Sequence, residues 1–243
     1  MSLLEIEGLS QSFSGLKALD DITLAVDPHQ VLGIIGPNGA GKTTLFSTIA
    51  GQLSPTSGRV RFDGQNITGW PAWRVARAGL VRTFQLMRPF ESMTVLDNVA
   101  VATHSRHRSR RVARDNAAEV IERVGLSEYR DRMSGVLPTA GLKRLELARA
   151  MALEPQVLML DEVLAGLVPT ERKPLIDLLD SLRSEGVTML FIEHIMAAVM
   201  SLSDRVLVLH EGRQLAVGSP DEVTSNPRVV QAYLGEEAQS AEA

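Results

Sequence analysis

The 243-residue chain contains no cysteine. Disulfide bonds, thiolate metal sites and cysteine nucleophiles are therefore excluded, and the absence is typical of a reducing compartment. The chain also lacks an apolar stretch of about 18 residues, the length that a membrane-spanning helix needs. Residues 1–7 show neither a basic start nor a long apolar run, so we expect no signal peptide. If the protein works at a membrane, we expect this chain to lie beside the bilayer.

An overall excess of positive charge is also missing, because 25 Lys and Arg residues stand against 29 Asp and Glu residues. Proteins that bind nucleic acid mainly through its phosphates need such an excess, so we expect no nucleic-acid partner. The local exception is the segment 104–114, which holds five arginines and no acid. Such a run usually forms a solvated helix face or loop. An anionic surface, such as lipid headgroups or an acidic loop of a partner, is the alternative.

The chain is rich in apolar residues, which make up 44% of it and suffice for a packed core. An apolar run at 31–35 leads into a glycine-rich turn, and apolar residues at helical spacing follow at 44–50. Residues 36–43 match the spacing G-x-x-x-x-G-K-[ST] of a phosphate-binding loop, which requires this order of strand, loop and helix. An ordinary glycine-rich loop is the weaker alternative, because both flanking elements are present.

The phosphate loop assigns a chemical role to its residues. Its glycines permit the backbone angles that turn successive N–H groups toward a phosphate chain. Lys42 is expected to reach the β- and γ-phosphates, Thr43 is expected to offer its hydroxyl to Mg²⁺, and the following helix adds partial positive charge. The expected nucleotide-binding residues of the loop are Gly36, Pro37, Asn38, Gly39, Ala40, Gly41, Lys42, Thr43 and Thr44.

Two further apolar runs end in polar residues. The run at 157–160 is followed by Asp161 and Glu162, and the run at 187–192 leads to His194. Buried strands of a parallel sheet would bring these side chains to the carboxyl edge, beside the phosphate loop. Asp161 is then expected to hold the Mg²⁺ shell, Glu162 to polarise an attacking water, and His194 to reach a γ-phosphate. A strand that simply ends in an acidic turn is the alternative.

The remaining patterns organise the rest of the chain. Apolar runs predict further strands at 3–7, 22–26, 58–62 and 81–84, and a hairpin at 205–209 and 214–217. Helical spacing predicts helices at 94–102, 117–124 and 142–153. We therefore expect one α/β domain over 1–243, with an inserted helical subdomain at about 88–150 and a flexible tail at 235–243.

The order of these features resembles the nucleotide-binding subunit of an ATP-binding cassette (ABC) transporter over nearly the whole chain. In detail it is most similar to the ATPases of branched-chain or hydrophobic amino acid uptake systems. The stretches that carry the resemblance are 15–19, 82–85, 93–98, 143–149, 192–194 and 232–236. The resemblance implies an α/β P-loop NTPase core of the RecA-like type, with an N-terminal antiparallel β subdomain and the inserted helical subdomain.

The resemblance also implies roles for individual residues. Phe13 matches the aromatic residue that stacks on adenine. Gln85 matches the glutamine that senses Mg²⁺ and the water, and whose loop touches the membrane subunit. Glu162 matches the general base, Asp161 the Mg²⁺-associated carboxylate, and His194 the switch histidine that contacts the γ-phosphate.

One stretch departs from the family pattern. Where the family usually has Leu-Ser-Gly-Gly-Gln, residues 137–141 read Leu-Pro-Thr-Ala-Gly. The family serine, which would bind the γ-phosphate in the opposing protomer, falls on Pro138, which has neither a hydroxyl nor an N–H. Thr139 and Gly141 are the remaining candidates for contact with that nucleotide, together with backbone donors at the start of the helix. Val163 stands where a proline is common.

The resemblance implies ATP and Mg²⁺ as cofactors and ATP hydrolysis coupled to the import of branched-chain or other hydrophobic amino acids at the cytoplasmic face of the inner (plasma) membrane. The implied partners are integral membrane permease subunits, a second ATPase subunit that is identical or not, and indirectly a solute-binding protein. An ATPase of lipid or lipopolysaccharide export is the nearest alternative. A soluble ABC ATPase acting on DNA or the ribosome is disfavoured by the acidic charge and the single cassette, and a P-loop kinase or GTPase by the helical insert.

Overall fold

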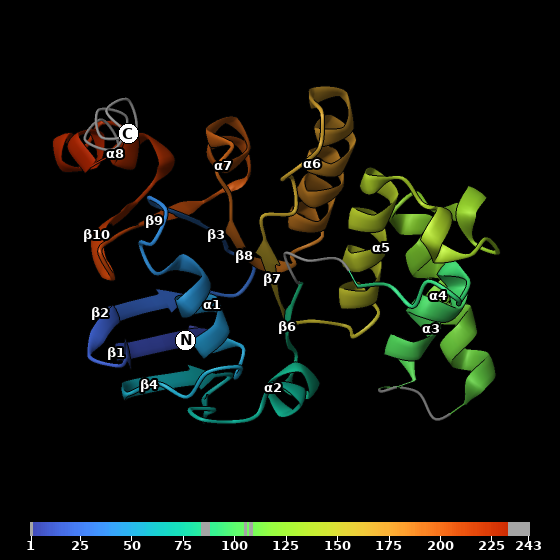
Figure 1. Ribbon diagram of the computed structural model, residues 1–243, viewed down its shortest axis with the longest axis horizontal. Helices are drawn as coiled ribbons and strands as arrows, with labels where there is room; N and C mark the ends of the chain where they lie inside the picture. Colours follow the sequence, from blue (N-terminus) through green and yellow to red (C-terminus); the bar gives the residue numbers. More distant parts are fainter. Residues whose placement is uncertain (1, 84–87, 105, 107–108, 233–243) are drawn as a thin grey trace.

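The computed structural model describes residues 2–83, 88–104, 106 and 109–232 (Figure 1). Its strands are β1 (Leu4–Phe13), β2 (Leu16–Val26), β3 (Val31–Ile35), β4 (Ser57–Phe62), β5 (Gln65–Asn66), β6 (Leu80–Arg82), β7 (Val157–Asp161), β8 (Thr188–Ile192), β9 (Arg205–His210) and β10 (Arg213–Gly218). Its helices are α1 (Lys42–Ile49), α2 (Ala72–Ala78), α3 (Val95–Thr103), α4 (Arg110–Arg123), α5 (Thr139–Met151), α6 (Pro169–Ser184), α7 (Met196–Leu202) and α8 (Pro220–Thr224), with 3₁₀ turns η1 (Ser127–Tyr129) and η2 (Ser134–Val136).

The described strands form two sheets. The antiparallel sheet has the order β2-β1-β4-β5, and the larger sheet has the order β10-β9-β3-β8-β7-β6. In the larger sheet all neighbours are parallel except β10, which forms an antiparallel hairpin with β9. Every residue of β3, β7 and β8 is buried, because both faces of this sheet are covered. The predicted hairpin and the predicted antiparallel strands are confirmed.

Alternate residues of the parallel strands belong to two different cores. Val31 and Ile35 of β3 pack in the core formed with α3 to α7, while Leu32 and Ile34 pack against α1 and the antiparallel sheet. The period of two follows from the pleat of a strand. Figure 1 shows α1 and the antiparallel sheet on one side of the parallel strands, and α3 and α4 at the far end of the molecule.

Several boundaries differ from the sequence prediction. β2 begins at Leu16 where the prediction had 22, and α5 spans Thr139–Met151 where the prediction had 142–153. β1 continues past residue 7 to Phe13, through register shifts opposite β2 that follow the positive φ of Gly8. Helix α4 begins at Arg110, earlier than the predicted 117. Arg110, Arg111 and Val112 at the start of α4 are exposed, and Ala113 is the one buried residue of the first turn, so hydrophobic periodicity is too weak there to predict the helix start.

The arginine-rich segment 104–114 is partly used inside the molecule. Arg106 donates from Nε to the carbonyl of Leu153 at 2.9 Å, and Arg114 forms an ion pair with Asp97 at 2.6 Å. Residues 105, 107 and 108 lie outside the described part. In the described ranges, none of the helices combines the length and apolar character that a bilayer crossing requires.

Candidate active site

The loop between β3 and α1 has the backbone conformation that a phosphate loop requires. Gly36 has a φ of +151° and Gly41 a φ of +101°. A Cβ on Gly41 would lie 2.5 Å from the carbonyl oxygen of Ala18, and one on Gly36 would collide with the carbonyl oxygen of Leu209. Any other residue at either position would have to displace backbone of β2 or β9. Both glycines are therefore required by tertiary packing as well as by the turn.

Lys42 lies at the centre of this loop. Its side chain is buried, and Nζ donates to the carbonyl oxygens of Gly36, at 2.5 Å, and Pro37, at 2.8 Å. These contacts hold the ammonium inside the curve of the loop. Asn38, Gly39 and Thr43 are exposed on its outer side, Thr44 is half-buried, and Ala40 is buried, with its carbonyl accepting the Gly212 N–H. A buried cation surrounded by loop backbone suits the binding of an anionic phosphate chain.

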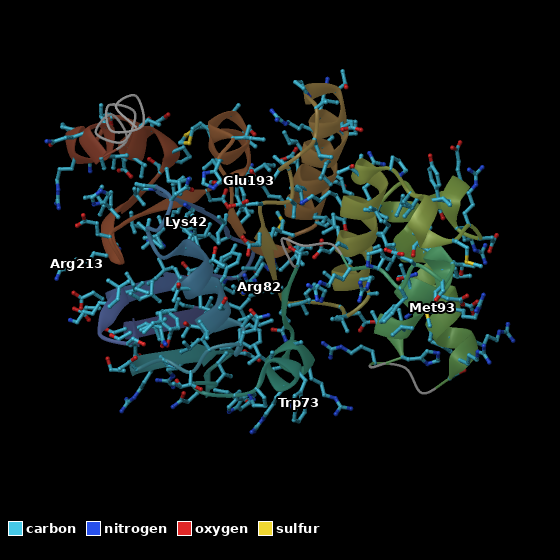
Figure 2. The ribbon with its side chains drawn as sticks, in the orientation of Figure 1. Lys42, Trp73, Arg82, Met93, Glu193 and Arg213 are labelled. Carbon is cyan, nitrogen blue, oxygen red and sulfur yellow. The ribbon has the colours of Figure 1, made fainter. Side chains whose placement is uncertain are left out.

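Asp161 ends β7 and forms a buried ion pair with Arg82 of the neighbouring strand β6; Figure 2 labels Arg82. Arg82 Nη2 lies 2.6 Å from Asp161 Oδ2, and both side chains are almost completely buried. Arg82 Nη1 also donates to Ser47 Oγ on α1 and to Gln52 Oε1. Arg82 therefore fixes the Asp161 carboxylate and ties it to the helix that follows the phosphate loop.

The second oxygen of Asp161 shows that the site suits a metal ion. In the part of the chain that the structure describes, Asp161 Oδ1 is buried and has no hydrogen-bond partner. Thr43 and Asp161 line the same cavity, of about 580 Å³. A hydroxyl and an unpaired carboxylate oxygen are hard oxygen donors of the kind that Mg²⁺ prefers. The residues present therefore fit Mg²⁺.

Glu162 and His194 meet at the ends of β7 and β8. The two strands are paired in register up to Asp161 and Ile192, and the Glu162 N–H donates to the Ile192 carbonyl at 3.0 Å. Glu162 then turns away with a φ of +50°. His194 Nε2 lies 3.0 Å from Glu162 Oε1. The predicted base and the predicted switch histidine are thus brought into direct contact.

Glu193 lies between these two residues and is almost completely buried. Its Oε1 accepts the Leu164 N–H at 2.8 Å, and its Oε2 accepts the His194 N–H at 3.3 Å. Burial raises the pKa of the Glu193 carboxyl above its ordinary value, and the two N–H donors oppose that rise. The carboxylate thus joins the loop after β7 to the loop after β8.

The other predicted site residues lie farther from this cluster or outside the description. Gln85 falls in 84–87 and is outside the described residues, as is the end of the strand predicted at 81–84. Phe13 is exposed at the end of β1, where it pairs with Leu16. Its hairpin leads along β2 to Ala18, whose carbonyl touches the phosphate loop. Stacking of Phe13 on adenine stays a prediction.

Thr139 and Gly141 occupy the first turn of α5, which packs against α3 and α4. Thr139 is exposed, whereas Gly141 is buried, and a Cβ on it would meet Leu137 and Pro138 at 3.2 and 3.3 Å. Pro138 is the N-cap and makes no side-chain capping bond. The role of this turn at a partner's nucleotide stays a prediction.

The sequence analysis missed three residues of the site: Arg82, Glu193 and Lys143. Lys143 is buried on α5, and its Nζ donates to the Glu162 carbonyl at 3.2 Å. Arg82 and Glu193 are charged residues at the ends of apolar runs, and that position was the available signal, whereas Lys143 stands beside Arg144 and had no such signal. Their partners lie on other elements, so the sequence could not name them.

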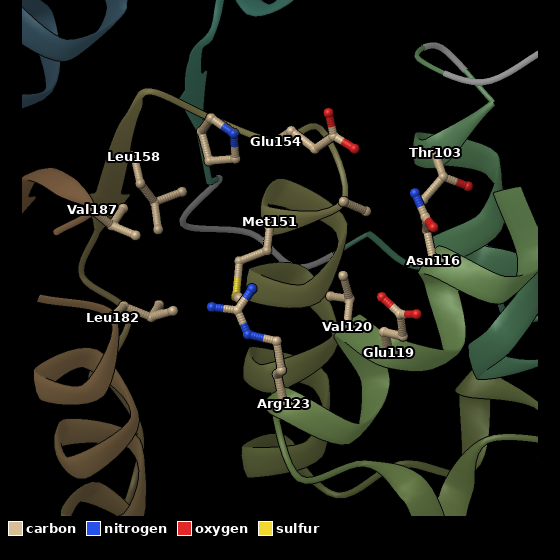
Figure 3. Close-up of a pocket in the computed structure, with 12 residues that line it drawn as sticks. Thr103, Asn116, Glu119, Val120, Arg123, Met151, Glu154, Leu158, Leu182 and Val187 are labelled. Carbon is tan, nitrogen blue, oxygen red and sulfur yellow. The ribbon is translucent and has the colours of Figure 1, made fainter. Parts of the chain in front are cut away.

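A second cavity, of about 380 Å³, lies between α4, α5 and the end of α6 (Figure 3). Leu158, Leu182 and Val187 line one wall, and Arg123 lies across from them. Leu158 and Val187 stand at the amino ends of β7 and β8, whereas Asp161 and His194 stand at the carboxyl ends. This cavity is therefore separate from the phosphate-binding region.

Comparisons with known proteins agree with this geometry. A family model described as ABC transporter matches residues 19–165, and one described as branched-chain amino acid ATP-binding cassette transporter matches 213–239. The chain is 45% identical to the high-affinity branched-chain amino acid transport ATP-binding protein BraF of Pseudomonas aeruginosa, over 96% of this chain and 98% of BraF. It is 42% identical to the corresponding protein LivG of Escherichia coli K12, with the same coverage.

Solved structures show the same fold. A nucleotide-free ATP-binding cassette from an ABC transporter matches with a TM-score of 0.87 and 31% identity, over 96% of this chain and 99% of that one. The ADP conformation of an ATP-binding cassette matches with a TM-score of 0.87 and 32% identity, over 97% and 99%. These matches confirm the predicted P-loop NTPase fold. The phosphate loop, the paired ends of β7 and β8 and these likenesses together show that the chain belongs to the ABC transporter family, as an ATP-binding subunit with ATPase activity.

Proposed function

We propose that this ATPase drives the uptake of branched-chain or other hydrophobic amino acids. The match of residues 213–239 to the branched-chain amino acid cassette model carries the proposal. The identities of 45% and 42% to two branched-chain amino acid transport proteins support it. The lipopolysaccharide export ATP-binding protein LptB of Haemophilus influenzae is 31% identical over 98% of this chain. Export therefore remains the second candidate, with a weaker likeness.

The proposed partners follow from the family. We propose that two permease subunits anchor this chain at the cytoplasmic face of the plasma membrane, and that a second ATPase subunit completes each nucleotide site. A solute-binding protein would deliver the amino acid to the permeases on the other side. The first turn of α5 and the Pro138 N-cap lack the serine hydroxyl that the family uses at the partner's nucleotide, which supports a partner ATPase that differs from this chain.

At the site, we propose that Lys42 turns its Nζ from the loop carbonyls to the β- and γ-phosphates of ATP, a short movement because Nζ already lies within the loop. The Thr43 hydroxyl and Asp161 Oδ1 would hold Mg²⁺, and Gln85 is proposed as a further ligand from the sequence. When bound, Mg²⁺ neutralises charge on the β- and γ-phosphates. Arg82 keeps Asp161 Oδ2 engaged, so that Oδ1 stays available.

In the proposed reaction the Glu162 carboxylate takes a proton from a water molecule as the water oxygen bonds to the γ-phosphorus. The bond from that phosphorus to the β–γ bridging oxygen breaks, and ADP leaves with its electron pair. His194 Nε2, already 3.0 Å from Glu162 Oε1, is placed to orient the carboxylate and to contact the γ-phosphate. Lys42 and the loop N–H groups stabilise the charge of the transferred group.

Glu162→Gln tests the base assignment. Because the amide cannot accept the proton, we expect hydrolysis to fall by about 10²- to 10⁴-fold while ATP affinity stays within about threefold. Steady-state turnover and equilibrium binding of ATP would be compared with those of Glu7→Gln, a matched change on the exposed face of β1. Unchanged turnover in Glu162→Gln would refute the assignment.

Reconstitution tests the transport proposal. The chain would be assembled in proteoliposomes with candidate permease subunits, a candidate second ATPase and a candidate solute-binding protein. We expect leucine, isoleucine or valine with the binding protein to stimulate ATPase activity and to accumulate inside in an ATP-dependent way. If lipopolysaccharide stimulated ATPase activity and no amino acid accumulated, the import proposal would be wrong and the export candidate would take its place.

A further inference from the structure

Glu193 is a buried carboxylate with no evident part in phosphate binding. Within the described ranges of the chain, no Lys, Arg or His side chain forms an ion pair with it, in contrast to Asp161, whose charge is matched by Arg82. Burial raises its pKa, so the charged form is disfavoured at this position. A neutral side chain would avoid that cost. The contacts that Glu193 makes must therefore explain what the carboxylate does here.

Those contacts form a closed circuit of hydrogen bonds, called the ring below. It joins the loop after β7, which carries the proposed base Glu162, to the loop after β8, which carries the proposed switch His194. From Glu162 the chain runs to Leu164, whose N–H donates to Glu193 Oε1. Glu193 is followed by His194, whose N–H donates to Glu193 Oε2 and whose Nε2 returns to Glu162 Oε1 at 3.0 Å. The ring also includes the backbone bond from the Glu162 N–H to Ile192.

The ring needs two acceptor oxygens that point in different directions. A carboxylate provides both, whereas an amide provides one acceptor and one NH₂ donor. An NH₂ group facing the Leu164 N–H would release the loop after β7, and one facing the His194 N–H would free the backbone that carries the imidazole. The side chain is also confined by burial, so it cannot rotate into solvent to escape the conflict.

We infer that Glu193 is a positioning residue for ATP hydrolysis, holding the loops after β7 and β8 as one unit so that the His194 imidazole stays against the Glu162 carboxylate. Glu193 does not touch the reacting atoms. It acts through His194 and through the backbone at Leu164, and so sets the orientation of the carboxylate that faces the water. The inference rests on the roles proposed above for Glu162 and His194.

Glu193→Gln is the direct test, because it preserves size and removes one acceptor. Loss of a hydrogen bond that orients a metal ligand lowers activity about 10- to 100-fold, and we expect a loss of similar size in kcat here, because Glu193 orients a site residue in the same way. We expect the KM for ATP, and ATP affinity measured in the Glu162→Gln background, to change by less than about twofold, because the phosphate loop is untouched. Glu7→Gln is the control, and we expect its turnover to be unchanged.

A double-mutant comparison shows whether Glu193 acts through His194. If it does, His194→Ala already removes what Glu193 supports, and Glu193→Gln/His194→Ala should have the kcat of His194→Ala within about twofold. Losses that multiply would overturn the inference, as would a normal kcat in Glu193→Gln. If Glu162→Gln and His194→Ala also retained full turnover, the proposed site itself would be wrong. If only Glu193→Gln retained full turnover, while Glu162→Gln and His194→Ala lost it, the inference about Glu193 would be wrong and the proposed site would stand.

Hydrogen exchange of the unmodified chain tests the ring without any substitution, should Glu193→Gln fail to fold. Leu164 stands in a loop, yet its N–H is buried against Glu193 Oε1, so we expect exchange at least about 100-fold slower than the rate of an unstructured amide. Exchange at the unstructured rate would mean that the ring does not form in solution, and would overturn the inference.

Discussion

Helices α1 and α5 both have a glycine at or near their first turn, and they differ in what precedes them. Helix α1 follows a loop with Gly36 and Gly41 at positive φ, and that loop is fixed against the backbone of β2 and β9. Helix α5 follows Pro138, and its glycine, Gly141, is packed on Leu137 and Pro138. Only the first arrangement encloses a buried lysine in a backbone loop. A helix start alone does not make a phosphate site, because the preceding loop must turn its N–H groups toward the ligand.

The largest expected effect comes from the buried charge that anchors the α1 region. Arg82→Met would leave Asp161 buried without its ion-pair partner, and we expect a loss of about 3 to 5 kcal/mol of unfolding free energy, measured by urea denaturation. Arg213→Met, at the exposed ion pair with Asp20 (Figure 2), should cost far less, because solvent screens that pair. Equal losses would show that burial does not distinguish the two pairs.

Two glycines of the phosphate loop, Gly39 and Gly41, should respond differently to alanine. Gly41→Ala combines a positive φ with a collision at the Ala18 carbonyl, so we expect about 2 to 4 kcal/mol of destabilisation and loss of ATP binding. Gly39→Ala has a positive φ but open space around its Cβ, and should cost about 1 kcal/mol. Thermal or urea unfolding measures both. A Gly39→Ala variant as unstable as Gly41→Ala would contradict the packing argument.

The start of α5 should gain from a capping side chain. Pro138→Ser keeps an extended N-cap and adds a hydroxyl that can accept a first-turn N–H, whereas Pro138→Ala adds none. We expect the serine variant to be more stable than the alanine variant by about 1 kcal/mol in urea unfolding. Identical stabilities would indicate that the N–H groups in the first turn of α5 already have hydrogen-bond partners. The start of α5 would then differ less from the start of α1.

The smallest effect concerns pH and the carboxylate in the ring of Glu162, Leu164, Glu193 and His194. The pKa of Glu193 is raised in the folded protein above its ordinary value of 4.5 by burial, so folding favours the protonated form. Its contribution to stability is fully present below that ordinary value and is lost as pH rises through the folded-state pKa. The unfolding free energy of the wild type minus that of Glu193→Gln should therefore decrease as pH rises above 4.5. An increase of this difference with rising pH would contradict a raised pKa of Glu193 in the folded protein.

Much of the site could be predicted because its signals are local. The spacing of Gly36, Gly41 and Lys42 demands a strand before it and a helix after it, and both flanking patterns are present in adjacent residues. The buried runs that end at Asp161 and near His194 are also local, because an apolar run of this length with both faces covered belongs in a parallel sheet. Their placement at one edge follows from the common direction of parallel strands.

What could not be predicted depends on which elements become neighbours. Arg82 pairs with Asp161 because β6 lies beside β7, and nothing in residues 80–82 names that neighbour. The first turn of α4 was missed because Arg110, Arg111 and Val112 are exposed and Ala113 is its one buried residue, which leaves no clear apolar period. Pairing of this kind is decided by the packing of the whole chain.

By itself, the sequence determined the phosphate loop, the buried strands that end in Asp161, Glu162 and His194, and the family of the chain, because these depend on residues close together in sequence. Only the tertiary structure decided that Arg82 neutralises one oxygen of Asp161, that β2 and β9 exclude any side chain at Gly36 and Gly41, and that Glu193 joins the loops after β7 and β8. These are contacts between residues far apart in the chain, and only the register of strands within the sheets brings them within bonding distance.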